Sequence, residues 1–115
     1  MHFDELNTEI RDFCEQRDWR QYHTPKDLAI GLSTESNELL EQFRFKDDDE
    51  QLALLDDPQG REAIEDELGD ILFFLLRFAD LYDIDLETAL AQKLEKNRAQ
   101  YPQEEYKGSN KKYDE

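Results

Sequence analysis

The sequence has little of three things: cysteine, positive charge and long hydrophobic runs. Cys14 is the only cysteine among the 115 residues, so an intrachain disulfide is excluded. No apolar run approaches the roughly 20 residues that a membrane-spanning helix needs, and the N-terminus lacks a signal-peptide pattern. We therefore expect a cytoplasmic protein with no membrane partner.

Positive charge is scarce, because 14 Lys and Arg residues stand against 30 Asp and Glu residues and the formal net charge is -16. Binding a nucleic-acid polymer through its phosphates needs a basic surface, so the charge argues against that class of partner. A nucleotide that arrives with its own metal ions is still allowed. The acidic run over residues 47–50 is expected to be solvated, and adaptation to high salt would also produce an acidic surface.

The sequence also lacks the alternation of polar and apolar residues that is typical of half-buried strands. Apolar residues recur instead at three- and four-residue spacing. This pattern predicts helices over residues 3–17, 25–45 and 61–82, and a fourth from residue 86 to Pro102. Thr24 and Asp85 are the expected N-caps, with Pro25 at the first helical position.

These elements predict an all-α protein, a four-helix bundle of antiparallel neighbours over residues 1–102. Residues 46–59 are expected to form a loop, in which 52–55 could make a short helical turn, and residues 103–115 a mobile polar tail. Hydrophobic residues make up only 37% of the chain, which is a thin core for a monomer. We therefore expect oligomerisation, with the apolar stretch 71–76 central or at a subunit interface, and Cys14 in the core.

The most informative motif consists of two acidic pairs, Glu35 with Glu38 and Glu67 with Asp70. Within each pair the residues are three apart, so both carboxylates lie on one face of a helix. Both pairs lie in segments that otherwise look like apolar helix, where an unpartnered carboxylate is costly to bury. If the two helices face each other, four carboxylates converge and repel unless a hard cation joins them. Mg²⁺ is the expected cation and Mn²⁺ a candidate substitute.

Acidic pairs are also ordinary on solvated helices, and for one isolated pair in so acidic a sequence that interpretation is favoured. Two observations favour a metal site. Apolar residues flank both pairs, and no basic residue lies between Asp27 and Gln42. Glu41, close to one turn beyond Glu38, could join the same face.

Basic and amide side chains follow on the last predicted helix. Lys93, Asn97 and Tyr101 are spaced four apart and share a face, with Arg98 beside it. A cation and an amide donor beside a metal-filled acidic cluster would suit the phosphates of a triphosphate. Alone, this spacing is typical of a solvated helix face.

Aromatic residues flank the second predicted helix at its two ends: Trp19, Tyr22, His23 and Phe45. Nucleobases commonly stack on aromatic rings, so these residues are a candidate base site. Places in the core or at an interface explain Trp19 and Phe45 equally well.

Together these residues resemble the MazG-like all-α nucleoside triphosphate pyrophosphohydrolases, and within them most closely the dCTP pyrophosphatase branch. The resemblance covers residues 3–102 and includes the order and spacing of every element. It is carried by Arg17-Asp18-Trp19, His23-x-Pro25, Leu28, Glu35-x-x-Glu38-Leu39, Glu41-x-Phe43, Glu67-Leu68-x-Asp70, Lys93, Asn97-Arg98 and Tyr101-Pro102.

The resemblance implies a Mg²⁺-dependent hydrolase that splits a (deoxy)nucleoside triphosphate, such as dCTP or a modified form, into a monophosphate and pyrophosphate. Its expected role is house-cleaning of the nucleotide pool, in a homodimer or a dimer of dimers with sites shared between subunits. The implied roles are metal binding for Glu35, Glu38, Glu67 and Asp70, phosphate binding for Lys93 and Asn97, and base binding for Trp19, His23 and Phe45.

For general-base catalysis we expect Glu38, with Glu41 as the second choice. Two positions depart from the family pattern. Phe45 stands where the closest relatives have tryptophan, and Phe74 stands where they have tyrosine. Both changes fall in the base and sugar pocket and leave the metal chemistry intact.

Two alternatives compete with this interpretation. A non-catalytic acidic helical module would explain the charge and the bundle, but not why Lys93 and Asn97 appear at matching positions. A phosphoribosyl-ATP pyrophosphohydrolase would use a related helical fold. The segment from Trp19 to His23 favours the nucleotide-pool enzyme over that alternative.

Overall fold

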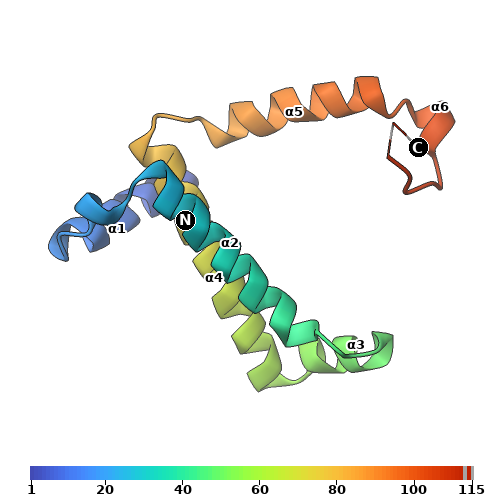
Figure 1. Cartoon of the computed structure of the whole chain (residues 1–115), viewed down its shortest axis with the longest axis horizontal. Helices are drawn as coiled ribbons and strands as arrows, with labels where there is room; N and C mark the ends of the chain where they lie inside the picture. Colours follow the sequence, from blue (N-terminus) through green and yellow to red (C-terminus); the bar gives the residue numbers. More distant parts are fainter. Residues whose placement is uncertain (113, 115) are drawn as a thin grey trace. The chain divides into compact units, whose positions relative to one another are not determined.

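A computed structural model describes residues 1–112 and 114, and none of these residues forms a strand. The predicted all-α class is therefore confirmed (Figure 1). The chain divides into an N-terminal unit, Met1–Tyr82, and a C-terminal unit, Asp83–Glu115. The elements are α1 (Phe3–Gln16), a 3₁₀ turn (Arg20–Tyr22), α2 (Pro25–Phe43), α3 (Asp48–Asp56), α4 (Pro58–Leu81), α5 (Leu86–Gln100) and α6 (Gln103–Tyr106).

Two helix starts lie where the sequence predicts them. The Thr24 side chain accepts a hydrogen bond from the Asp27 N–H at 3.1 Å, and Pro25 opens α2. The Asp85 carboxylate accepts from the Thr88 N–H at 3.2 Å and opens α5. Each side chain satisfies a backbone donor that has no partner inside its helix, and so fixes where the helix begins.

The expected loop over residues 46–59 is wrong, because most of it is the helix α3. Asp47 and Glu50 form a capping box, in which each side chain accepts a hydrogen bond from the other residue's backbone N–H. The acidic residues of the first turn also face the positive end of the helix dipole. The run of like charges is exposed, as expected, but it starts a helix. The next helix, α4, begins three residues earlier than predicted, with Asp57 as N-cap and Pro58 at the first position.

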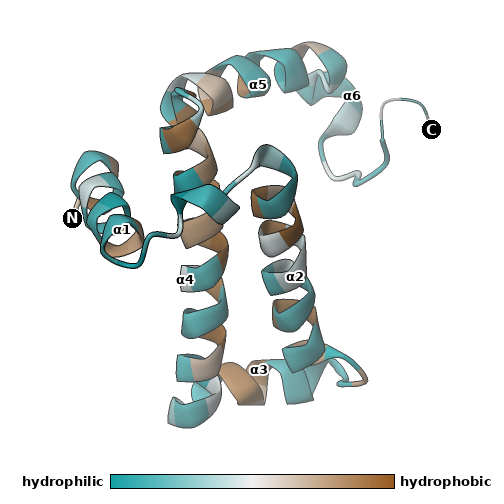
Figure 2. Ribbon diagram, turned by 60° about the vertical axis from the view of Figure 1, so that its left-hand side comes forward, coloured by the Kyte–Doolittle hydropathy of each residue, from teal (hydrophilic) through white to brown (hydrophobic). Residues whose placement is uncertain are grey.

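In the N-terminal unit, α2 and α4 run antiparallel, side by side, and α3 joins them at one end (Figure 2). Helices α1 and α3 also pack on α4, so α4 is central to this unit. Within its apolar stretch 71–76, Leu76 is buried and Leu75 is exposed, so a place in the core or at a subunit interface stays a prediction. The core consists of Cys14, Leu28, Ile64, Leu76 and Ala79, which confirms the placement of Cys14.

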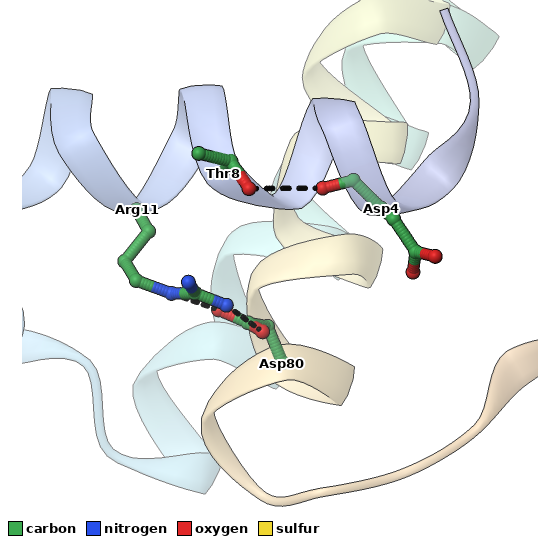
Figure 3. Close-up of polar contacts among 4 residues, drawn as sticks. All are labelled: Asp4, Thr8, Arg11 and Asp80. Carbon is green, nitrogen blue, oxygen red and sulfur yellow. Dashed lines mark hydrogen bonds and ion pairs between the residues drawn. The ribbon is translucent and has the colours of Figure 1, made fainter.

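An ion pair joins α1 to the C-terminal end of α4. The guanidinium of Arg11 donates two hydrogen bonds to the carboxylate of Asp80, at 2.8 and 3.2 Å (Figure 3). This two-point contact fixes the orientation of α1 as well as its distance.

The fourth helix of the predicted bundle, α5, belongs to the C-terminal unit, so the four-helix bundle stays a prediction, as do the boundary at residue 102 and the mobility of the tail. The expected polar tail starts with the short helix α6, and its residues 113 and 115 lie outside the described part of the chain. Among the described residues, every helix is too short or too polar to cross a membrane.

Candidate active site

The predicted metal ligands lie on the two paired helices of the N-terminal unit. Glu35 and Glu38 lie on α2, and Glu67 and Asp70 lie on α4. One carboxylate oxygen from each of the three glutamates lies within 4.8 Å of the other two. This span is on the scale of a divalent cation's ligand shell, in which each oxygen lies about 2.0–2.6 Å from the ion.

Two carboxylate oxygens of these glutamates are buried without a hydrogen-bond partner in residues 1–112 and 114. Within the described residues, Oε2 of Glu35 and Oε2 of Glu67 are buried and form no hydrogen bond. A buried carboxylate oxygen that lacks a partner is costly. The donor set therefore fits a hard cation such as Mg²⁺, which would bind these oxygens.

The electrostatics agree with the geometry. Burial of the carboxyl group, reinforced by the neighbouring Glu38, raises the pKa of Glu35 to about 7. Burial also raises the pKa of Glu67, and the charges of Glu38 and Asp70 act in the same direction. In the absence of a cation, the carboxyl groups of Glu35 and Glu67 therefore hold protons more tightly than free carboxyl groups do, because the pKa of each is raised.

The other two predicted acidic residues lie beside the cluster. Asp70 is exposed on α4, outside the group of close oxygens, and its charge acts on both Glu35 and Glu67. Glu41 is exposed on α2, and its carboxylate pairs with Arg44 at 3.2 Å. This pairing orients Glu41 toward the end of α2.

Three of the four predicted base-binding residues belong to one chain of ring contacts. Phe74 contacts Phe73, which contacts Phe13, with centroid distances of 5.4 and 6.1 Å. Phe13 in turn contacts Trp19 at 5.4 Å, and Trp19 contacts His23 at 6.5 Å. All four contacts are edge-to-face, the arrangement that the ring quadrupoles favour.

Residue 45, the fourth predicted base-binding position, is placed differently. Phe45 follows the end of α2 with a φ of 63°, and its side chain is 89% exposed. The Arg44 guanidinium lies 4.5 Å from the centre of its ring. The Phe45 backbone is thus in the left-handed region, which is uncommon for a bulky residue, and its ring is open to solvent apart from the Arg44 contact.

Phe13 and Phe73 were missed by the sequence interpretation, although they link the predicted aromatic residues. They line a groove of about 450 Å³ between α1 and α4, together with Glu9, Ile10, Asp12 and Gln16. The signal for Phe13 was its place on the apolar face of the first helix, which also fits an ordinary core residue.

The model of the MazG-like family matches residues 30–115, which is most of the chain. This chain belongs to the MazG-like family. It is 38% identical over 102 residues to a Bos taurus protein named dCTP pyrophosphatase 1, covering 89% of this chain and 60% of that protein. The Homo sapiens protein of the same name is 36% identical over 104 residues, covering 90% and 61%. The chain thus spans about 60% of the length of the curated relatives it matches.

A solved structure agrees with the fold of this MazG-like chain. The crystal structure of a pyrophosphatase from Archaeoglobus fulgidus matches with a TM-score of 0.82 and 38% sequence identity, and the match covers 89% of this chain and 94% of that one.

The predicted phosphate-binding residues of this MazG-like chain lie in the C-terminal unit, at α5 and its end. Lys93 and Arg98 are exposed, whereas Asn97 and Tyr101 are half-buried. Arg98 pairs with Glu95 one turn earlier, and the Tyr101 ring packs edge-to-face on Tyr106 at 4.9 Å. Their role in phosphate binding stays a prediction.

Proposed function

We propose that this protein hydrolyses a (deoxy)nucleoside triphosphate to a monophosphate and pyrophosphate in a Mg²⁺-dependent reaction. One observation carries the proposal: Glu35 and Glu38 of α2 and Glu67 of α4 bring carboxylate oxygens within 4.8 Å of one another, and Glu35 and Glu67 each have a buried oxygen without a partner among the described residues. Membership of the MazG-like family and the names of the matched relatives support this reaction class. These names also favour dCTP, or a modified pyrimidine nucleotide, as the substrate.

The cation would be held by Glu35, Glu38, Glu67 and Asp70. When bound, it supplies charge neutralisation at the phosphates and on the leaving pyrophosphate. The side chains supply the proton chemistry. Glu38 is exposed, so its carboxylate can take the proton of an attacking water, which is the role of a general base. Glu41 is the second choice, because its carboxylate is already paired with Arg44.

We assign the residues that would bind the phosphates and the base by their side-chain chemistry. In our proposal Lys93, Asn97, Arg98 and Tyr101 bind the phosphates, which suits their positive charges and hydrogen-bond donors. Trp19, His23, Phe45 and Phe74 bind the base, and the ring contacts among the Trp19, His23 and Phe74 group support this part.

We further propose that the protein acts as a homodimer or homotetramer. The two site helices α2 and α4 leave large apolar side chains exposed: Ile30 at 52%, Leu40 at 57% and Leu68 at 50%. A second copy of the chain would remove these side chains from water. Size-exclusion chromatography with light scattering measures the mass directly, and a monomeric mass at micromolar concentration would contradict this part.

The decisive experiment is a pyrophosphate-release screen with Mg²⁺ over the canonical and several modified nucleoside triphosphates. We expect release from at least one pyrimidine deoxynucleotide, and no release when the cation is chelated. A Glu62→Gln variant, changed at an exposed position of α4 outside the cluster, is the matched control for Glu35→Gln. Silence across the whole panel would instead favour a non-catalytic acidic binding module.

A further inference from the structure

Helix α4 contains one charged residue in its apolar second half. Arg77 is the only charged residue between Ile71 and Ala79, and only 1% of its surface is exposed. Within residues 1–112 and 114 it forms no ion pair. A buried guanidinium is costly unless a good acceptor compensates it. The acceptor that Arg77 contacts therefore matters both for stability and for the geometry of its surroundings.

That acceptor is the imidazole of His23. The Nε–H of Arg77 donates a hydrogen bond to Nδ1 of His23 at 3.1 Å. A guanidinium has donors only and stays protonated in proteins. Nδ1 must therefore present its lone pair, and a neutral imidazole in this contact carries its single proton on Nε2.

The surroundings keep the ring neutral. Burial, followed by the positive charge of Arg77, lowers the pKa of His23, and the carboxylate of Asp27 opposes this shift. The position of the residue is fixed as well. The Tyr82 hydroxyl donates to the His23 carbonyl oxygen at 2.7 Å, and the His23 N–H donates to the Arg20 carbonyl at 3.0 Å.

We propose that Arg77 is a positioning residue that sets the tautomer of His23, so that His23 presents its Nε2–H to a ligand as a hydrogen-bond donor. This inference rests on the proposed function for its substrate part. For the substrate, we infer that His23 favours a base whose edge presents a hydrogen-bond acceptor, either a carbonyl oxygen or an unprotonated ring nitrogen. A base edge that presents an amino group at the same point would leave two donors facing each other, which disfavours binding.

The test reads the tautomer directly by long-range ¹H–¹⁵N NMR of the ¹⁵N-labelled, ligand-free protein at pH 7.5. In the wild type we expect His23 to have an unprotonated Nδ1 and a protonated Nε2. Arg77→Met removes the donor and the charge, and should show exchange between both tautomers and a higher His23 pKa. Arg77→Lys keeps the charge and should retain part of the pKa depression. Arg11→Met removes a surface guanidinium and should leave the His23 signals unchanged.

A wild-type spectrum with the proton on Nδ1 would overturn the proposal, even if Arg77→Met failed to fold. So would an unchanged His23 tautomer in a folded Arg77→Met protein. Because this measurement uses no substrate, it stands whether or not the nucleotide screen finds activity.

The substrate part has its own measurement, made on whichever nucleotide the screen identifies. We expect KM to rise about two- to tenfold in Arg77→Met, the factor that a weakened neutral hydrogen bond produces, with kcat nearly unchanged. A KM equal to that of Arg11→Met would overturn the selection role and leave the tautomer result standing.

Discussion

The two halves of α4 hold buried polar groups in opposite ways. In the first half Glu67, with Glu35 of the neighbouring α2, has a buried oxygen without a partner among the described residues, and burial raises the pKa of both glutamates. In the second half Arg77 is buried more completely, yet its Nε–H donates to the ring of His23. The acidic half would gain from a ligand outside the chain, whereas the basic half has its hydrogen-bond acceptor within the chain.

This difference distinguishes residues that would bind an external cation from residues that hold another side chain in position. An unpartnered buried group marks where an external cation gains the most, because binding removes a cost that folding left in place. A buried group with a partner fixes the geometry of that partner. Four predictions test this division, from the largest expected effect to the smallest.

Glu38→Gln should lower kcat on the order of a hundredfold or more, the range of lost general-base catalysis. The amide keeps the size of the side chain and removes its basicity. Initial rates of pyrophosphate release at saturating nucleotide measure the effect. Glu41→Gln, changed one turn further along α2, should stay within a few-fold of wild type. The reverse ranking would assign the base to Glu41.

Millimolar Mg²⁺ should raise the melting temperature, because a ligand that binds only the folded state stabilises it. The gain is about 2.7 kcal/mol when free Mg²⁺ is about a hundred times its Kd, which corresponds to roughly ten degrees for a chain of this size. Thermal unfolding with and without the cation measures the shift. Glu67→Gln should reduce it and Glu62→Gln should not. A melting temperature that Mg²⁺ leaves unmoved in the wild type would argue against a preformed metal site.

Two helical glycines should respond in opposite directions to alanine. At Gly31 an added Cβ would lie 2.5 Å from the ring of Phe74, and such overpacking costs about 1–3 kcal/mol. At Gly69, between Glu67 and Asp70, it would meet no described atom within 4 Å apart from its chain neighbours and the helix's own backbone. Gly69→Ala should therefore add about 1 kcal/mol through helix propensity. Chemical denaturation measures both, and a destabilising Gly69→Ala would contradict the open space beside this position.

Acidity should stabilise the cation-free protein over a defined window. Because the folded-state pKa of Glu35 is raised to about 7, the folded state binds more protons than the unfolded state from the ordinary glutamate pKa up to that value. Stability should then fall as pH rises across this window. Melting temperatures from pH 5 to 8 check this trend, which Glu35→Gln should flatten relative to Glu62→Gln. A steeper decline in Glu35→Gln would contradict the assignment.

Short-range signals in the sequence predicted much of this fold. Thr24 and Asp85 cap the helices that they were expected to cap, because capping depends on a residue and the next three positions. The same rule explains the missed helix α3. Its capping box is built from Asp47 and Glu50, inside a run of like charge that resembles a solvated loop. The sequence interpretation treated this acidic run as solvated and did not use the capping pattern within it.

Contacts between distant residues could be predicted only where chemistry demanded them. The clustering of Glu35 with Glu67 was expected, since four carboxylates in apolar helices need a common cation. The pairing of Arg77 with His23, 54 positions apart, left no such mark in either local sequence. An isolated arginine in an apolar helix shows that a partner exists, but packing of the turn before α2 against α4 decides which residue it is.

The capped helix α3 has a consequence for how this chain can vary in length. It links α2 to α4 and packs on α4, so a residue added within α3 would turn its packing face. Residues added to the connection at 45–46, by contrast, would lengthen only the segment between α2 and α3. One residue added inside α4 between Glu67 and Arg77 would instead turn everything beyond it by about 100°. The acidic and aromatic groups would then point in different directions. Insertions should therefore be tolerated in the connection before α3 and should inactivate the protein in α4, because the phase of a single helix keeps the proposed acidic and aromatic parts of the site aligned.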